Sequence, residues 1–309
     1  MKPETAATMT PATSGAGSRG VLLQILGLQR SGNHAIIDWL ESLYPTALHL
    51  NEQPHAFFED AESVAAVRAA LAKTDCVIVS FEDAVGVSKL QGKPFLDNVR
   101  RLDPEDFPGH ACHVLHILRD PYNCWASRVK ARERGRLSSS RRLEDFRRDW
   151  VDIARLAERT PDAVVLYNAW HGSRRYREAL CARLGGSYSE RTLREVRSEG
   201  GGSSFDGYGR PTWRTIAGNL GYYCSKRFRK RFLSAPGSYL ARLFARPVDG
   251  RSLKVDSRWQ HVLDHEASRP LFSDAEIRSL SDRIFGFHVE AGGEMRKQPQ
   301  AAGTVAPAE

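Results

Sequence analysis

The sequence predicts a three-layer α/β fold, in which helices flank a central parallel sheet of about four or five strands. Short apolar runs of strand length alternate along the chain with longer segments whose apolar residues recur at the helical period. Strands and helices that alternate in this way form parallel sheets wound by right-handed crossovers. With 309 residues, the chain is long enough to bury a substantial core.

Four apolar runs are the expected strands. They are residues 21–26, 76–81, 113–118 and 163–167. Helices are expected from about residue 33, at 61–72, after 121, and at 143–159, 176–184 and 274–285. The last helix carries the pattern of a capping box, with Ser273 as its N-cap and Glu276 at its third position.

The ends of the chain differ in composition from its middle. Residues 1–19 and 292–309 are rich in small residues and lack periodicity, which predicts disordered tails around one domain at 20–291. Within that domain, residues 210–256 mix aromatic and basic side chains and are interpreted as a basic insertion. The strongly basic residues 129–142 are expected to form a mobile, solvated segment.

The formal net charge of +8 favours an anionic partner. Because acidic residues interleave with the basic ones, the pattern favours local anion pockets, and we expect no nucleic-acid partner. The five cysteines are odd in number and contain no C-x-x-C pair, which predicts free thiols in a reducing compartment. Residues 1–20 contain no apolar h-region, and no uncharged apolar run approaches the membrane-spanning length of about 20 residues. We therefore expect a cytoplasmic protein without stable membrane insertion, with peripheral membrane contact left open.

The first strand leads into the glycine-bounded loop 27–32, which precedes a helix. A loop of this kind cradles an anion with its backbone N–H groups and with the positive end of the helix dipole. The spacing G-x-x-x-x-G is P-loop-like, yet Asn33 and His34 stand where a P-loop has Lys and Ser or Thr. The expected anion is therefore not a magnesium triphosphate, and the cation is Arg30 within the loop. A purely structural strand-to-helix connection is the alternative.

Two other strand ends carry polar residues. Arg119 follows the third strand, and Ser127 lies eight residues later in the next helix. Glu82 and Asp83 follow the second strand. Because ligands bind at the carboxyl ends of parallel strands, these residues are expected at the same sheet edge as the loop.

Together these motifs resemble the sulfotransferases that use 3′-phosphoadenosine 5′-phosphosulfate (PAPS). In that family a basic residue, Ser or Thr, Gly and two polar residues open the first helix, as residues 30–34 do here. Arg119 and Ser127 have the spacing of the family's 3′-phosphate motif. VVLYNAW, with the helix and the Gly-Gly stop after it, is similar to the strand, tyrosine and helix that close the family's central sheet. The resemblance covers about residues 20–190. Beyond them it is patchy, with Gly200 to Gly209 and Arg258-Trp259 in the slot of the family's C-terminal nucleotide loop.

The resemblance implies sulfuryl transfer from PAPS to a hydroxyl or amine, with no metal. The implied donor-binding residues are Gln29, Arg30, Ser31, Gly32, Asn33, His34, Arg119 and Ser127. Arg30 would stabilise the charge that grows on the leaving phosphate. Glu82 aligns with the position of the general base, which is a His in the family's cytosolic branch and a carboxylate in other branches. His55, Glu52 and Asp83 are competing bases. The acceptor is expected to be a small-molecule, carbohydrate or lipid-like compound.

Two departures and two rival functions stand beside this resemblance. Ala35 replaces an aromatic residue that stacks on adenine in many members, and Arg30 replaces the Lys of the cytosolic branch. The rivals are a degenerate P-loop kinase or hydrolase and a non-catalytic anion-binding protein. His261 and His265 have metal-ligand spacing, but without a third ligand nearby they are interpreted as surface residues, and no metal site is predicted.

Overall fold

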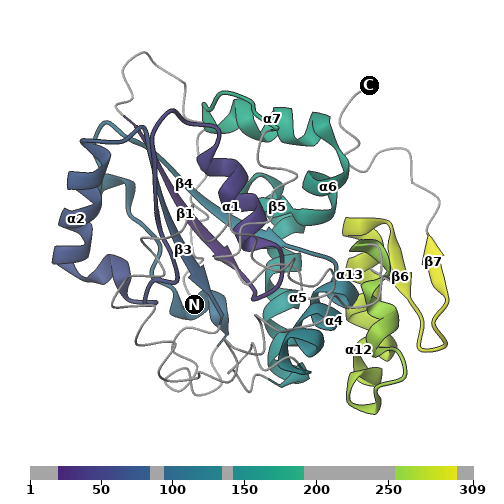
Figure 1. Ribbon diagram of the computed structural model, residues 1–309. Helices are drawn as coiled ribbons and strands as arrows, with labels where there is room; N and C mark the ends of the chain where they lie inside the picture. Colours follow the sequence, from purple (N-terminus) through teal and green to yellow (C-terminus); the bar gives the residue numbers. More distant parts are fainter. Residues whose placement is uncertain (1–19, 84–93, 134–141, 191–254, 298–309) are drawn as a thin grey trace, which may run out of the picture.

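A computed structural model describes residues 20–83, 94–133, 142–190 and 255–297 (Figure 1). Its centre is a five-stranded, fully parallel sheet with the order β2-β3-β1-β4-β5. The strands are β1 (Val21–Gly27), β2 (Ala47–Leu50), β3 (Cys76–Glu82), β4 (Ala111–Leu118) and β5 (Val164–Leu166). Helices flank this sheet, so the predicted three-layer α/β class is confirmed.

Helices cover both faces of the sheet, and β1 shows why. Leu22 and Leu26 pack into one core cluster, whereas Leu23 and Ile25 pack into the other, as the two-residue period of a strand requires. The first cluster contains residues of α2 (Ala61–Leu71), α4 (Pro121–Glu133), α5 (Leu143–Arg159) and α13 (Ala275–Phe285). The second contains residues of α1 (Asn33–Glu41), α6 (Tyr167–Gly172) and α7 (Arg174–Leu184).

Three elements differ from the sequence-based expectation. The edge strand β2 was not predicted. The fourth strand is shorter than 163–167, because Tyr167 already begins α6. Helix α4 continues to Glu133, through part of the segment 129–142 that was expected to be mobile, and its buried Ala131 explains why the helix persists.

Two features of the C-terminal part differ from the prediction: the residue that caps α13 and the structure that follows this helix. Asp274, not Ser273, caps α13, because its carboxylate accepts the Ile277 amide at 2.9 Å, and Glu276 consequently moves to the second helical position. The chain then forms a hairpin of β6 (Phe287–Val289) and β7 (Met295–Lys297). Strand β6 precedes the predicted tail 292–309, whereas β7 lies in the part of it that was expected to be disordered. The remaining short elements are α3 (Phe95–Asn98), α12 (Arg269–Ser273), and the 3₁₀ helices η1 (Phe57–Glu59), η3 (Pro104–Asp106), η4 (Pro161–Ala163), η6 (Val255–Val262) and η7 (Glu266–Ser268).

Several predictions fall outside the described residues. They concern the tail 1–19, residues 210–254 of the basic insertion and the glycine-rich loop 200–209. Within the described part of the chain, no helix combines the length and the apolar character needed to cross a membrane.

Candidate functional site

The sheet brings three strand ends to one edge. β1 lies between β3 and β4, and Gly27 at its end is in register with Glu82 on one side and Ile117 on the other. The loop after β1, the acids after β3 and Arg119 after β4 therefore meet at the carboxyl edge of the sheet. This is the convergence that the strand-end rule predicts.

The loop between β1 and α1 uses left-handed backbone at two positions. Gly32 has φ 98°, and a Cβ atom there would lie 2.2 Å from the Tyr167 ring, so glycine alone fits. Arg30 has φ 70°, a conformation that costs a non-glycine residue about 1–2 kcal/mol. The loop thus holds its cation in a strained backbone, which is typical of functional sites.

Ser31 faces into the loop. Its hydroxyl lies 2.7 Å from the Leu28 carbonyl oxygen and 2.6 Å from Asn33 Oδ1, and its amide donates to the same Leu28 carbonyl at 3.1 Å. Both polar groups of Ser31 are therefore used within the loop, although the resemblance implied a ligand contact. These hydrogen bonds stabilise the turn between β1 and α1.

The first turn of α1 supplies the N–H groups of the cradle. The Ile36 amide donates to the Gly32 carbonyl at 3.1 Å, which is the first hydrogen bond of the helix. The amides of Asn33, His34 and Ala35 precede it and have no intrahelical acceptor. Together with the helix dipole they favour an anion at this position.

Asn33 turns its side chain back toward β3. Its Nδ2 donates to Glu82 Oε1 at 2.8 Å and to the Leu28 carbonyl at 3.1 Å. Gly27 makes room for this conformation, because a Cβ atom there would lie 2.0 Å from Asn33 Oδ1. The Asn33 side chain thus orients the Glu82 carboxyl, while its amide remains at the cradle.

Glu82 is a nearly buried carboxyl, 8% exposed. Burial raises its pKa, and the negative charges of Asp83 and Glu52 act in the same direction. The charge of His34 and the hydrogen bond from Asn33 lower the pKa in part. A carboxyl with a raised pKa is suited to accept a proton near neutral pH.

Asp83 has a structural role. It is fully buried, accepts the Gln29 amide at 2.6 Å and pairs with Arg128 at 2.6 Å. Arg128 in turn donates to the Gln29 carbonyl at 3.0 Å. The two side chains therefore clamp both sides of the Gln29 residue, and this pairing makes Asp83 a poor general base.

Arg119 joins the loop to the neighbouring strand end. It is 3% exposed, its Nη1 lies 3.4 Å from the Arg30 carbonyl oxygen, and its guanidinium lies 4.9 Å from the centroid of the Tyr167 ring. Asp120 beside it caps α4, accepting the Asn123 amide at 2.8 Å. The side chain of Arg119 thus contacts the backbone of Arg30, the other predicted cation.

The remaining predicted residues surround this centre. Ser127 is buried in α4. His34 is half-buried and near enough to Glu82 to affect its pKa. His55 Nε2 lies 3.5 Å from the Glu82 carbonyl oxygen, and the exposed Glu52 also acts on the Glu82 charge. His55 and Glu52 therefore stay as competing bases.

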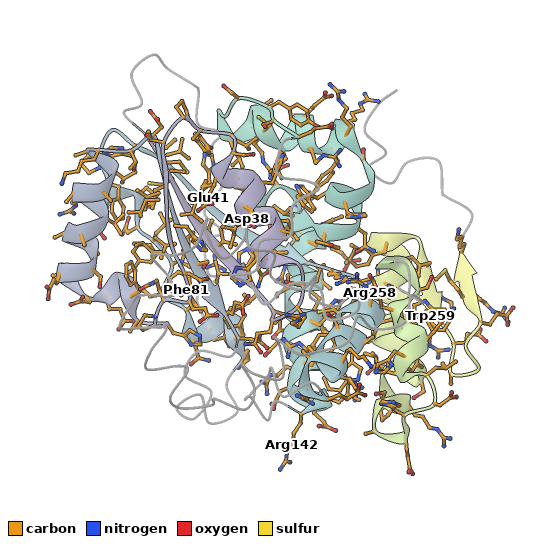
Figure 2. All side chains as sticks on the ribbon, viewed as in Figure 1. Asp38, Glu41, Phe81, Arg142, Arg258 and Trp259 are labelled. Atoms are coloured by element: carbon orange, nitrogen blue, oxygen red, sulfur yellow. The ribbon has the colours of Figure 1, made fainter. Side chains whose placement is uncertain are left out.

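Three residues of the site were not identified from the sequence. Arg128 clamps the loop, Tyr167 packs against Gly32 and Arg119, and Asn123 accepts the Trp259 amide at 3.0 Å. Arg258 and Trp259 lie on the side of the molecule that carries the C-terminal helices (Figure 2). The only sequence signal was position, since Arg128 directly follows Ser127 and Tyr167 directly follows a strand.

Comparison of the chain with protein-family models and with curated proteins gave no match.

Proposed function

We propose that this protein is a PAPS-dependent sulfotransferase. The observation that carries the proposal is the arrangement around Asn33. Its backbone belongs to a cationic anion cradle, and its side chain holds the buried Glu82 carboxyl at 2.8 Å. An anion-binding group and a proton acceptor next to each other are the two parts that sulfuryl transfer needs.

In the proposed complex the cradle binds the 5′-phosphosulfate. The amides from Gly32 to His34 and the Arg30 side chain face that group, while Arg119 and Ser127 bind the 3′-phosphate. Asp83 and Arg128 hydrogen-bond to the backbone amide and carbonyl of Gln29, respectively, and these bonds fix the start of the loop. Binding of the sulfate through the cradle requires no metal ion.

The proposed reaction is an in-line displacement at sulfur. An acceptor hydroxyl or amine attacks, a bond from its oxygen or nitrogen to sulfur forms, and the bond from sulfur to the bridging oxygen breaks. The electron pair of the broken bond stays on the 5′-phosphate of the product nucleotide, where Arg30 and the loop amides stabilise the charge. The acceptor proton moves to Glu82, whose raised pKa suits this role.

The kinase or hydrolase alternative is less well supported. It requires Mg²⁺ held by a hydroxyl or carboxylate at the loop. The Ser31 hydroxyl is engaged within the loop, and Asp83 is paired with Arg128. A non-catalytic anion-binding protein explains the cradle but gives no reason for an oriented, buried carboxyl beside it.

The acceptor belongs to the class of small molecules, carbohydrates or lipid-like compounds. We infer a reducing compartment such as the cytoplasm, because Cys76, Cys112, Cys124 and Cys181 are all free thiols.

A transfer assay tests the proposal. Purified full-length protein is incubated with ³⁵S-labelled PAPS and a panel of alcohols, phenols, sugars and amines. Wild type is expected to label at least one class, Glu82→Gln to bind donor but lose transfer, and Arg30→Ala to lose both. Glu105→Gln, an exposed acid, serves as the control. Tight donor binding without any transfer would instead establish an anion-binding protein.

A further inference from the structure

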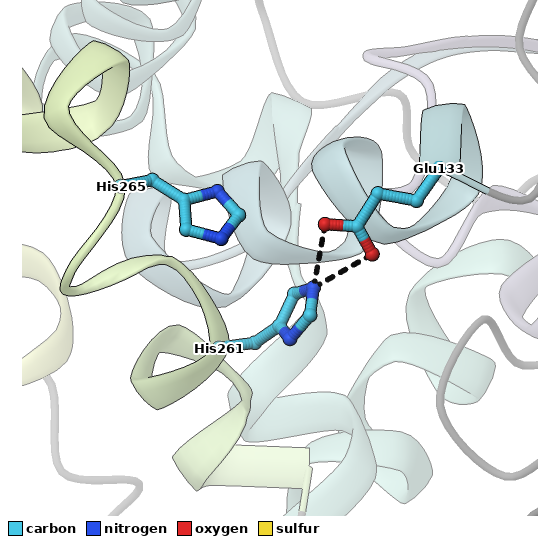
Figure 3. Close-up of side chains that lie close together, drawn as sticks. All are labelled: Glu133, His261 and His265. Carbon is cyan, nitrogen blue, oxygen red and sulfur yellow. Dashed lines mark hydrogen bonds and ion pairs between the residues drawn. The ribbon is translucent and has the colours of Figure 1, made fainter.

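A second group of polar side chains lies where α4 ends and η6 passes beside it. Glu133 is the last residue of α4, His261 lies in η6, and His265 follows four residues later (Figure 3). Both Glu133 carboxylate oxygens lie 3.0 Å from His261 Nε2. The His265 ring centroid lies 5.5 Å from that of His261. The sequence offered two histidines with metal-ligand spacing, and the fold adds a carboxylate from 128 positions away.

The three side chains are close enough to share one ion. One ligand atom from each lies within 4.8 Å of the others. In a tetrahedral zinc site, with bonds of about 2.0–2.1 Å, ligand atoms are about 3.3 Å apart. The Glu133–His261 separation already approaches that value, and side-chain rotation of His265 completes the triangle.

The Glu133 carboxylate supplies the negative charge of the cluster, and the positive charge of Lys130 lies beside it. A metal ion would be bound by the two histidines as neutral imidazoles and by Glu133 as a carboxylate. Lys130, 3.2 Å from Glu133, is the group that an ion must displace.

We propose that Glu133, His261 and His265 bind a zinc-class transition-metal ion. Two imidazoles and one carboxylate suit Zn²⁺ and its neighbours in the Irving–Williams series, whereas Mg²⁺ and Ca²⁺ prefer oxygen ligands. Three protein ligands leave a fourth position open to solvent or to a further ligand. All three residues are at least partly exposed, so an ion can reach the site.

The hydrogen-bonded pair alone does not account for the whole cluster. A Glu133–His261 bond needs no second imidazole, yet His265 is placed beside it. The ion would also link η6 to α4, in addition to the existing hydrogen bond from the Trp259 amide to Asn123. A metal here would therefore fix Arg258 and Trp259 relative to the start of α4, where Arg119 lies.

Calorimetric titration of the full-length, metal-free protein with Zn²⁺ tests the site. Wild type is expected to bind one equivalent. Glu133→Gln and His265→Gln are each expected to lose at least about tenfold in affinity, the loss that even an outer-shell change causes at metal sites. His288→Gln is the matched control, because His288 pairs with Asp282 at 2.8 Å outside the cluster. Thermal unfolding without metal verifies that each variant folds.

Two results would overturn the proposal. One is Zn²⁺ affinity that stays unchanged in both Glu133→Gln and His265→Gln. The other is an equal loss in His288→Gln, which would indicate non-specific binding. Because no nucleotide or acceptor is present, the result is independent of the sulfotransferase proposal.

Discussion

The side-chain amide of Asn33 donates a hydrogen bond to Glu82 Oε1 across 2.8 Å, and this bond joins the first turn of α1 to the end of β3. The first residue of α1 therefore also positions the buried Glu82 carboxyl. A substitution that removes the charge of Glu82 therefore tests two things separately. One is the free-energy cost of burying that charge, and the other is its proposed role as proton acceptor.

Glu82→Gln should stabilise the protein while it abolishes transfer. Glutamine can still accept the Asn33 hydrogen bond, but it carries no charge to bury. We expect a gain of about 1 kcal/mol at neutral pH, or roughly 2–4 °C in Tm. The measurement is thermal unfolding in parallel with the transfer assay.

The same comparison fixes the sign of the pH dependence. The pKa of Glu82 is raised in the folded state, so its favourable contribution is complete below the ordinary value of 4.5 and is lost as pH rises through the folded pKa. Wild type and Glu82→Gln should therefore unfold alike near pH 4 and diverge at higher pH. A constant difference across the pH range would show that the charge of Glu82 is not the cause.

Disruption of the Asp83–Arg128 clamp should destabilise the whole domain. Both side chains are about 1% exposed, and removal of one partner leaves a buried charge without its counterion. Asp83→Ala and Arg128→Ala should each lower the free energy of unfolding by about 3–5 kcal/mol. The double variant should cost less than the sum of the two single costs. Denaturant unfolding measures all three, with the exposed Arg174→Ala as a control that costs well under about 1 kcal/mol.

The Arg30→Gly variant should have a higher free energy of unfolding than wild type, and it should lose ligand binding. Glycine relieves the left-handed backbone at φ 70°, which we expect to raise the free energy of unfolding by about 1 kcal/mol. The missing guanidinium removes the cation of the cradle. Glu52→Gly relieves a similar backbone at φ 51° and should keep ligand-induced stabilisation. A normal nucleotide response in Arg30→Gly would contradict the assigned role.

Gly32→Ala should lower the free energy of unfolding more than an alanine substitution at a glycine that has the same backbone conformation but open space around it. Gly185 has φ 69° and open space around it, so Gly185→Ala should cost about 1–2 kcal/mol. At Gly32 the added methyl would also meet Tyr167 at 2.2 Å, which adds at least about 1 kcal/mol and displaces the loop. Equal costs in denaturant unfolding would show that the Tyr167 contact is not rigid.

The sheet could be predicted because its central strands are buried on both faces and therefore appear as continuous apolar runs, as at residues 21–26 and 76–81. The edge strand β2 was missed because its four residues are half-exposed or exposed and give a weak pattern. Tyr167 was assigned to a strand because an aromatic residue after Val-Val-Leu favours β structure, but the chain turns there into α6.

From the sequence, only those residues of the site that lie at the ends of strands could be predicted. The convergence of Arg30 and Arg119 follows from topology. The inward turn of Asn33, the clamp by Arg128 and the approach of Glu133 to His261 depend on contacts between residues 45 to 128 positions apart. Local sequence patterns carry no information about such pairs.

Thermal unfolding with adenosine 3′,5′-bisphosphate is the most direct test of the central claim. A ligand at a hundred times its Kd stabilises the folded state by about 2.7 kcal/mol. We predict stabilisation by this nucleotide without Mg²⁺, a weaker effect of 5′-AMP, and loss of that difference in Arg119→Ala. Stabilisation by ATP with Mg²⁺ and none by adenosine 3′,5′-bisphosphate would contradict the account.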